Sequence, residues 1–243
     1  MLKAFSKTLG LLFLFIAVGL YFDSTYFLSV TTYGQQIANV LLLVVTLIVL
    51  YKASPRYKEQ MVYAIVIGIA GEYIFSIGLG MYSYRLGNIP HYIPLGHAIV
   101  YIAVIYFLKQ NAVIPHKKML ERVLGIFISL YTLIFLLFFN DVYGFVLTVL
   151  ILILLRNKPR ERLFYYTMYL VVAYLELVGT GYQAWFWPSY AFDKFTWIPS
   201  ANPPSGISFF YFGLDLGCLW LYKKRHNIAW QRMKFIRNLS SQK

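Results

Sequence analysis

The sequence predicts an all-α, polytopic membrane protein with about eight transmembrane helices. Three observations favour this fold class. Hydrophobic residues make up 60% of the chain and charged residues only 13%, whereas a soluble domain carries about 25% charged residues. Apolar runs of about 20 residues, the length that crosses a bilayer, recur along the chain. Lysine and arginine gather in alternate connections between these runs.

The first four predicted helices fill the N-terminal half of the chain. The first apolar run begins after Lys3 and Lys7. No small-residue cleavage site precedes Asp23, so this run is expected to be an anchoring helix rather than a signal peptide. Charged or proline-containing connections separate the runs that follow. The predicted helices span residues 8–22, 34–51, 61–84 and 93–108.

Four further helices are predicted in the C-terminal half. Basic connections precede the first and third of them, and a short polar break separates the first from the second. The segment ANPPSG precedes the last helix, and its double proline excludes a helix there and favours an extended approach. The predicted helices span residues 123–139, 142–155, 163–187 and 206–222.

The basic residues predict the orientation of the chain. With both termini and alternate connections on one side, 20 of the 22 lysines and arginines lie there, and only Arg85 and Lys194 lie opposite. The positive-inside rule then places both termini in the cytoplasm, which favours a multi-pass protein of the inner (plasma) membrane. The net charge of +13 does not indicate nucleic-acid binding, because this basic surface faces the anionic inner leaflet.

The C-terminal segment 223–243 is predicted to be a basic cytoplasmic tail. Juxtamembrane cations often only enforce topology. Trp230, Met233 and Ile236 also recur at roughly helical spacing among the cations. This pattern indicates an alternative role, a short amphipathic helix that binds anionic lipid.

The two halves of the chain share landmarks that predict a tandem repeat. FDSTY ends the first helix and FNDVY ends the fifth, and the third and seventh helices each carry a glutamate followed by two glycines and two aromatic residues. We therefore expect two parallel four-helix repeats, over 1–122 and 123–222, related by an axis along the membrane normal. The alternative is that aromatic belts and proline-containing loops recur in any membrane protein.

Three acidic residues fall well inside predicted spans: Glu72, Glu176 and Asp215. A charge at the bilayer centre costs at least roughly 2.5–3.5 kcal/mol, so such residues usually face the bundle interior and serve a function. Carboxyl groups in an apolar cleft can give or accept a proton, and His97 is a candidate acid/base or hydrogen-bond partner of Glu72. The alternative is that these carboxyl groups only fasten neighbouring helices together.

The outer connections RLGNIPHYIPLGH and PSYAFDKFTWIPSANPPSG are aromatic and nearly free of charge. They are expected to fold as lids over a cleft that an apolar substrate enters from lipid, where aromatic faces would also stabilise a cation. The alternative is plain interfacial anchoring. The candidate substrate-binding residues are Tyr82, Tyr84, His91, Trp185, Trp187 and Asn202.

Several classes of site are excluded or disfavoured. The four histidines are too few for a di-iron desaturase, and a two-histidine metal site has only one loose spacing in its favour, so no metal and no cofactor are expected. The single cysteine, Cys218, excludes an internal disulfide. No lysine lies within a predicted span, which excludes a retinal Schiff base, and no Walker, GxSxG or HExxH motif occurs.

The motif E-x5-G-x-G-x-Y-x-Y, from Glu72 to Tyr84, is followed by IPHYIPLG. Together they resemble membrane-embedded carotenoid-biosynthesis proteins, which include carotene hydratases and tandem-repeat lycopene cyclases. In this chain His97 follows the motif, where an aromatic residue would be expected. The resemblance implies a cofactor-independent helical enzyme in which Glu72, and by the internal repeat Glu176 and Asp215, take part in protonation.

These observations favour an intramembrane enzyme of the lyase or isomerase class that uses acid/base chemistry on a hydrophobic isoprenoid or lipid. A hydratase, cyclase or isomerase would each fit. One alternative is a proton-coupled transporter or lipid-binding protein with a midplane carboxylate site. Another is a non-catalytic membrane subunit or assembly factor. Protein partners and oligomeric state have no signal in the sequence.

Overall fold

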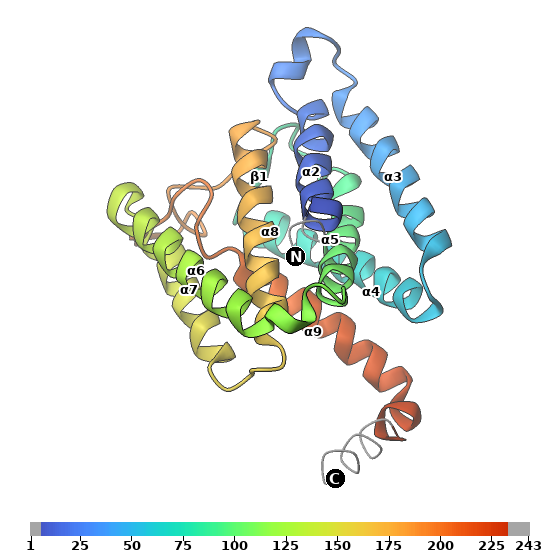
Figure 1. Cartoon of the computed structure of the whole chain (residues 1–243). Coiled ribbons are helices and arrows are strands. Elements are labelled where there is room, and N and C mark those ends of the chain that lie inside the picture. Colours follow the sequence, from blue (N-terminus) through green and yellow to red (C-terminus); the bar gives the residue numbers. More distant parts are fainter. Residues whose placement is uncertain (1–5, 233–243) are drawn as a thin grey trace.

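The computed structural model describes residues 6–232 and is mostly helical (Figure 1). Two short π-helical segments, η1 (Ser6–Gly10) and η3 (Tyr73–Gly78), run directly into or out of α-helices. The α-helices are α2 (Leu11–Phe22), α3 (Gly34–Lys52), α4 (Pro55–Glu72), α5 (Tyr92–Leu108), α6 (Lys117–Phe139), α7 (Val142–Leu155), α8 (Arg162–Gly181) and α9 (Ser208–Arg225).

Four of the helical segments are long and apolar enough to cross a membrane: Gly34–Lys52, Pro55–Gly78, Ile114–Phe139 and Arg162–Gly181. Three shorter apolar segments, Ser6–Phe22, Tyr92–Leu108 and Val142–Leu155, lie among them. The helical membrane-protein class predicted from composition is therefore supported by the length and composition of these four segments.

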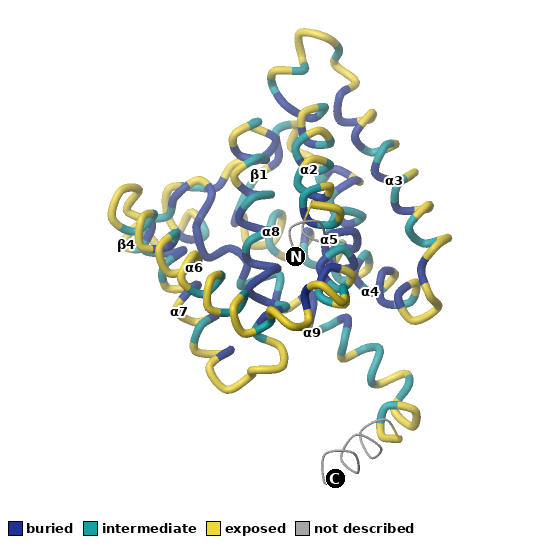
Figure 2. The backbone as a smooth tube through the Cα atoms, in the orientation of Figure 1, coloured by how far each residue is buried: buried dark blue, intermediate teal, exposed yellow. Residues whose placement is uncertain are grey.

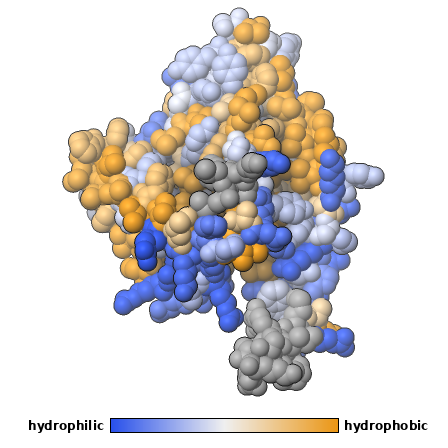
Figure 3. Space-filling view, viewed as in Figure 1, coloured by the Kyte–Doolittle hydropathy of each residue, from blue (hydrophilic) through white to orange (hydrophobic). Residues whose placement is uncertain are grey.

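The outer helices present apolar side chains to their surroundings. Along α6 only Ile128 and Thr132 are buried, while Leu137 and Phe138 are among the most exposed side chains of the chain. Figures 2 and 3 show this exposed, apolar surface on α6 and along α3. In water such a patch would be an aggregation hazard, but it is the ordinary surface of a helix that faces lipid tails.

The core of the fold is formed by α4, α5, α8 and α9. Helix α4 packs against α5 and α9, and α5 also packs against α8. Small buried residues, Ala64 on α4 and Ala98 on α5, face this core and allow the helices to approach closely. Helix α3 lies along one side of the bundle, and α6 and α7 lie along the other (Figure 1).

Two predicted helices end earlier than expected. The helix predicted over 61–84 ends at Gly78, and the one predicted over 163–187 ends at Gly181. Positive φ angles at Gly80 (63°) and Gln183 (56°) turn the chain out of the helical path. The residues that follow form the two-residue strands β1 (Ser83–Tyr84) and β2 (Trp185–Phe186). The expectation that the aromatic pairs belong to the helices was therefore wrong.

The connection before α9 agrees with the prediction. Strands β3 (Tyr190–Ala191) and β4 (Phe195–Pro199) form a second small antiparallel sheet. Residues 201–206, which include the ANPPSG prolines, contain no helix and bring the chain to the start of α9. Residues 203–206 are buried against the bundle.

Candidate functional site

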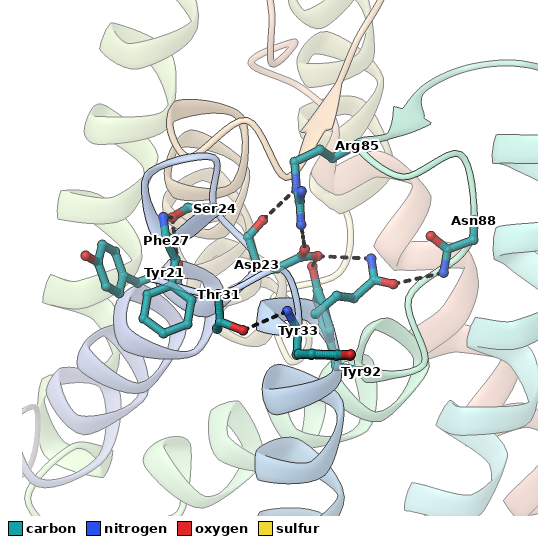
Figure 4. Close-up of polar contacts among 10 residues, drawn as sticks. Tyr21, Asp23, Ser24, Phe27, Thr31, Tyr33, Arg85, Asn88 and Tyr92 are labelled. Carbon is teal, nitrogen blue, oxygen red and sulfur yellow. Dashed lines mark hydrogen bonds and ion pairs between the residues drawn. The ribbon is translucent and has the colours of Figure 1, made fainter. Parts of the chain in front are cut away.

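A buried aspartate anchors the connection that carries β1. Asp23, which is 0% exposed, accepts hydrogen bonds from Arg85 Nη2 at 2.5 Å and from Tyr92 Oη at 2.7 Å (Figure 4). Gln35 Nε2 donates to the same carboxylate at 3.3 Å. Arg85 follows Tyr84 directly, so this ion pair sets the position of β1 relative to α2 and α5.

A second buried aspartate anchors the connection before α9. Asp141 is also 0% exposed, and its carboxylate accepts three backbone N–H bonds. The donors are Gly144 at 3.1 Å, Ala201 at 3.0 Å and Ser205 at 2.7 Å. Asp23 and Asp141 are therefore both loop anchors that are enclosed by protein.

Pairing of β1 with β2 brings the two aromatic pairs into contact. The strands are antiparallel, with Ser83 opposite Phe186 and Tyr84 opposite Trp185. The Tyr84 and Trp185 rings lie 6.2 Å apart, and the Tyr82 and Trp187 rings lie 4.7 Å apart. Residues about 100 positions apart in the chain thereby form one aromatic layer at the end of α4 and α8.

Glu72, the last residue of α4, is buried beneath this layer and has both carboxylate oxygens occupied. Tyr82 Oη and Tyr84 Oη donate to Oε2 at 2.8 and 2.6 Å. His97 Nε2 lies 3.2 Å from Oε1. Burial, followed by the nearby Glu72 carboxylate, raises the pKa of Tyr82 and Tyr84 well above that of free tyrosine. The two phenols therefore stay protonated and act as hydrogen-bond donors.

Glu176, on α8, has a different environment. Trp185 Nε1 and Trp187 Nε1 both donate to Oε2, at 2.8 and 3.0 Å. Oε1 makes no hydrogen bond with the described residues, although the side chain lines the same cavity as Glu72. Indole N–H groups can only donate, so they stabilise an oxygen that carries negative charge and do not compete for a proton.

A cavity of about 260 Å³ lies between the two glutamates. Helices α4, α5, α8 and α9 and the β1–β2 sheet all contribute to its wall. An apolar crevice of about 80 Å³, lined by α2, α3 and α5, adjoins it and shares Ile93, His97, Trp185 and Tyr211. The polar groups of the cavity are thus few and are surrounded by apolar and aromatic side chains, the usual composition of a small-molecule site.

The structure brings together most of the residues predicted for the site. Seven of them line the cavity: Glu72, Tyr82, Tyr84, His97, Glu176, Trp185 and Trp187. His91 is exposed at the start of α5 and does not line the cavity. Asn202 acts one step away from it, because its Oδ1 accepts the backbone N–H of Trp187 at 3.1 Å.

Asp215 lies apart from the cavity. Its helix contributes Tyr211, Gly213 and Leu214 to the lining, but Asp215 is enclosed elsewhere, and neither of its carboxylate oxygens has a hydrogen-bond partner. A buried charge without a partner is costly, so the neutral form is favoured. A catalytic role for Asp215 stays a prediction.

Tyr211 is a site residue that the sequence reasoning missed. Its ring lies 5.0 Å from the His97 ring, and it lines the same cavity as Glu72 and Glu176. It stands in the aromatic run SFFYFG, in which no spacing distinguishes it from residues that face lipid. Tyr211 faces the cavity because of the way α9 is rotated about its own axis, which the sequence does not indicate.

Gly179→Ala should perturb the site from outside the cavity. A Cβ added at Gly179 would overlap the Trp185 ring, so the indole must move and its hydrogen bond to Glu176 must lengthen. We expect the site to lose most of its activity and the tryptophan fluorescence spectrum of the purified protein to change. Gly181→Ala is the matched control, because a Cβ there meets nothing within 4 Å. Equal behaviour of the two variants would contradict the assigned role of Trp185.

Among residues 6–232, no group of three or more His, Cys, Asp or Glu side chains lies close enough together to hold a metal ion. The chain matches no protein-family model, no curated protein and no solved structure. The resemblance to carotenoid-biosynthesis proteins therefore stays a prediction based on the motif that begins at Glu72.

Proposed function

We propose that this protein is an integral-membrane enzyme that performs acid/base chemistry on a hydrophobic isoprenoid or lipid substrate. The observation that carries the proposal is the pair of buried glutamates on one cavity in contrasting hydrogen-bond environments. Two carboxyl groups whose surroundings differ in this way are suited to opposite roles, one as acid and one as base.

Glu176 is the proposed acid. Its Oε2 accepts two indole N–H bonds and so is the carbonyl oxygen of the protonated group, which leaves Oε1–H directed to the cavity. After the proton leaves, the same two N–H groups stabilise the carboxylate. In the proposed step, the π electrons of a substrate double bond form a C–H bond with this proton, and a carbocation remains on the neighbouring carbon.

Glu72 and His97 form the proposed base. The Glu72 carboxylate, held by two phenols, contacts His97 and orients its imidazole. The base takes a proton from the carbon next to the cation, which completes an isomerisation or cyclisation, or from an attacking water, which completes a hydration. Aromatic faces around the cavity, such as Tyr82 and Trp187, would stabilise the cation between these steps.

The cavity and the adjoining crevice suit an apolar substrate. The crevice wall from α2 and α3 consists of aliphatic and aromatic side chains, so the unreactive part of a long isoprenoid would find no polar group there. An isoprenoid or polyene substrate also agrees with the resemblance of the Glu72 motif to carotenoid-biosynthesis proteins. A cofactor is not needed for this redox-neutral chemistry.

We further propose that all eight helices span the inner membrane, with both termini in the cytoplasm. The matched anchors Asp23 and Asp141, and the matched carboxylates Glu72 and Glu176, support two parallel four-helix repeats. The tail prediction that involves Met233 and Ile236 lies outside the described residues.

The position of the carboxylates favours an enzyme over a transporter. Glu72 lies six residues before the end of the apolar segment Pro55–Gly78, and Glu176 lies five residues before the end of α8. Both groups therefore lie near one end of their helices, beneath an aromatic layer, whereas rocking transporters bind substrate near the midplane.

The proposal is tested by extracting apolar lipids and pigments from cells that express the wild type or Glu72→Gln and comparing them by mass spectrometry. We expect a product of the wild type to decrease strongly in the variant and a precursor of equal mass, or lighter by one water, to accumulate. Glutamine keeps an oxygen that accepts from the two tyrosines, so the variant should be equally abundant. Identical extracts from equally abundant proteins would refute the enzyme proposal.

A further inference from the structure

An open surface groove of about 560 Å³ lies between α6 and α8, at the start of both helices. Its wall carries three cations, Lys118 and Arg122 from α6 and Arg162 from α8. The one acid in the wall, Glu121, is paired with Lys117 at 3.7 Å, so the groove keeps a net positive charge. It does not include any residue of the Glu72–Glu176 cavity.

Arg162 is fixed in place, while the two α6 cations are exposed. Arg162 Nη2 donates to the carbonyl oxygens of Arg156 at 2.7 Å and Leu155 at 3.3 Å. Lys118 and Arg122 lie one turn apart on α6, and neither side chain forms a salt bridge with an acid within residues 6–232. The arrangement is a partly preorganised set of donors for one anionic oxygen group.

The groove continues into an apolar strip along α6. Ile126 and Leu130 line its inner end, and both are exposed. Further along the helix Ile134, Leu137 and Phe138 are also exposed. Cations at the mouth, followed by an apolar strip parallel to a helix that is long enough to cross a membrane, match the layout of a phospholipid. Figure 3 shows the same change from hydrophilic to hydrophobic surface on this face.

We propose that this groove binds an anionic membrane phospholipid, with its phosphate between Lys118, Arg122 and Arg162 and an acyl chain along Ile126 and Leu130. The phosphate supplies the negative charge that balances these three cations. A free phosphate would leave the apolar part of the groove empty. The inference does not depend on the proposed enzyme function or on which end of α6 faces the cytoplasm.

The test uses the purified full-length protein in neutral detergent, with thermal unfolding followed as ligand is added. Dioleoyl phosphatidylglycerol should raise the melting temperature in a saturable manner, and phosphatidylcholine with the same chains should not. Glycerophosphoglycerol and inorganic phosphate distinguish the sources of the anion. An equal shift with these soluble ions would overturn the lipid assignment in favour of a soluble phosphate.

The double variant Lys118→Gln/Arg122→Gln should weaken phosphatidylglycerol binding at least tenfold while its melting temperature without lipid is unchanged, since both side chains are exposed. Arg156→Gln/Arg160→Gln removes the same charge from exposed positions of the α7–α8 connection and is the matched control. Equal weakening in both pairs would show that only overall charge matters and would overturn the site. Retention of one lipid by the wild type and the control, but not by the groove variant, in native mass spectrometry would support it.

Discussion

Replacing Glu176 by glutamine should lower the rate of product formation by about 10²- to 10⁴-fold, the range that a positioned general acid contributes. The amide keeps an oxygen that accepts from Trp185 Nε1 and Trp187 Nε1, so the tryptophans need not move. The amide nitrogen takes the place of Oε1 and cannot supply a proton of comparable acidity to an alkene. The rate is measured as product accumulated per amount of folded protein in the membrane fraction.

The control for this variant is Glu161→Gln. Glu161 is exposed in the connection before α8, and the same Glu→Gln substitution there alters only a surface position. We expect wild-type product formation from it. A Glu176→Gln variant that is folded and as active as this control would exclude Glu176 as the acid. A variant that is inactive but also poorly folded would instead indicate that Glu176 fastens the helices together.

The positions of the eight helices and of both glutamates could be predicted from the sequence, because long apolar runs and ionisable residues within them are strong local signals. The hydrogen-bond environment of the two glutamates could not be predicted in this way. Two-residue strands have no periodicity, so the pairing of Tyr84 with Trp185 left no trace that pattern reasoning detects. The aromatic pairs were instead assigned to the ends of long helices.

The remaining differences between prediction and structure concern which face of a helix points into the cavity and which charged groups are buried. Asp215 and Tyr211 stand one turn apart on α9, yet only Tyr211 lines the cavity, and no pattern in the apolar sequence around them indicates which one does. The ion pair between Arg85 and Asp23 could not be predicted from the sequence either. The sequence places Arg85 apart from most other cations, on the outer side, whereas the structure shows it as the half-buried partner of Asp23, 62 residues away.

Asp141→Ala should be the most destabilising single change outside the cavity. It leaves three buried backbone N–H groups, of Gly144, Ala201 and Ser205, without an acceptor. Each such group costs about 1–3 kcal/mol, and with partial relaxation we expect a total loss of about 3–5 kcal/mol. Thermal unfolding in detergent should show a melting temperature lower by roughly 10 °C.

Asp141→Asn tests the hydrogen bonds alone, because the amide fills the same space as the carboxylate. Both carboxylate oxygens accept, so an amide of the same shape must direct its NH₂ group at a backbone N–H whichever way it turns. We expect the melting temperature of Asp141→Asn to lie between those of the wild type and Asp141→Ala. Asp193→Asn, at an exposed turn between β3 and β4, is the matched control and should unfold as the wild type does. A stable Asp141→Asn would contradict the anchoring role.

The same anchor should also affect the site through a short chain of contacts. Asp141 holds Ala201 and Ser205, the intervening Asn202 accepts the backbone N–H of Trp187, and Trp187 donates to Glu176. Product formed per folded molecule should therefore decrease in Asp141→Asn, even at temperatures where the variant stays folded. Tyr143→Phe is the comparison, since the hydroxyl of Tyr143 is buried without a partner and its removal leaves this chain of contacts intact. A decrease in Asp141→Asn alone would connect the anchor to the carboxylate, whereas equal activity in both variants would confine Asp141 to stability.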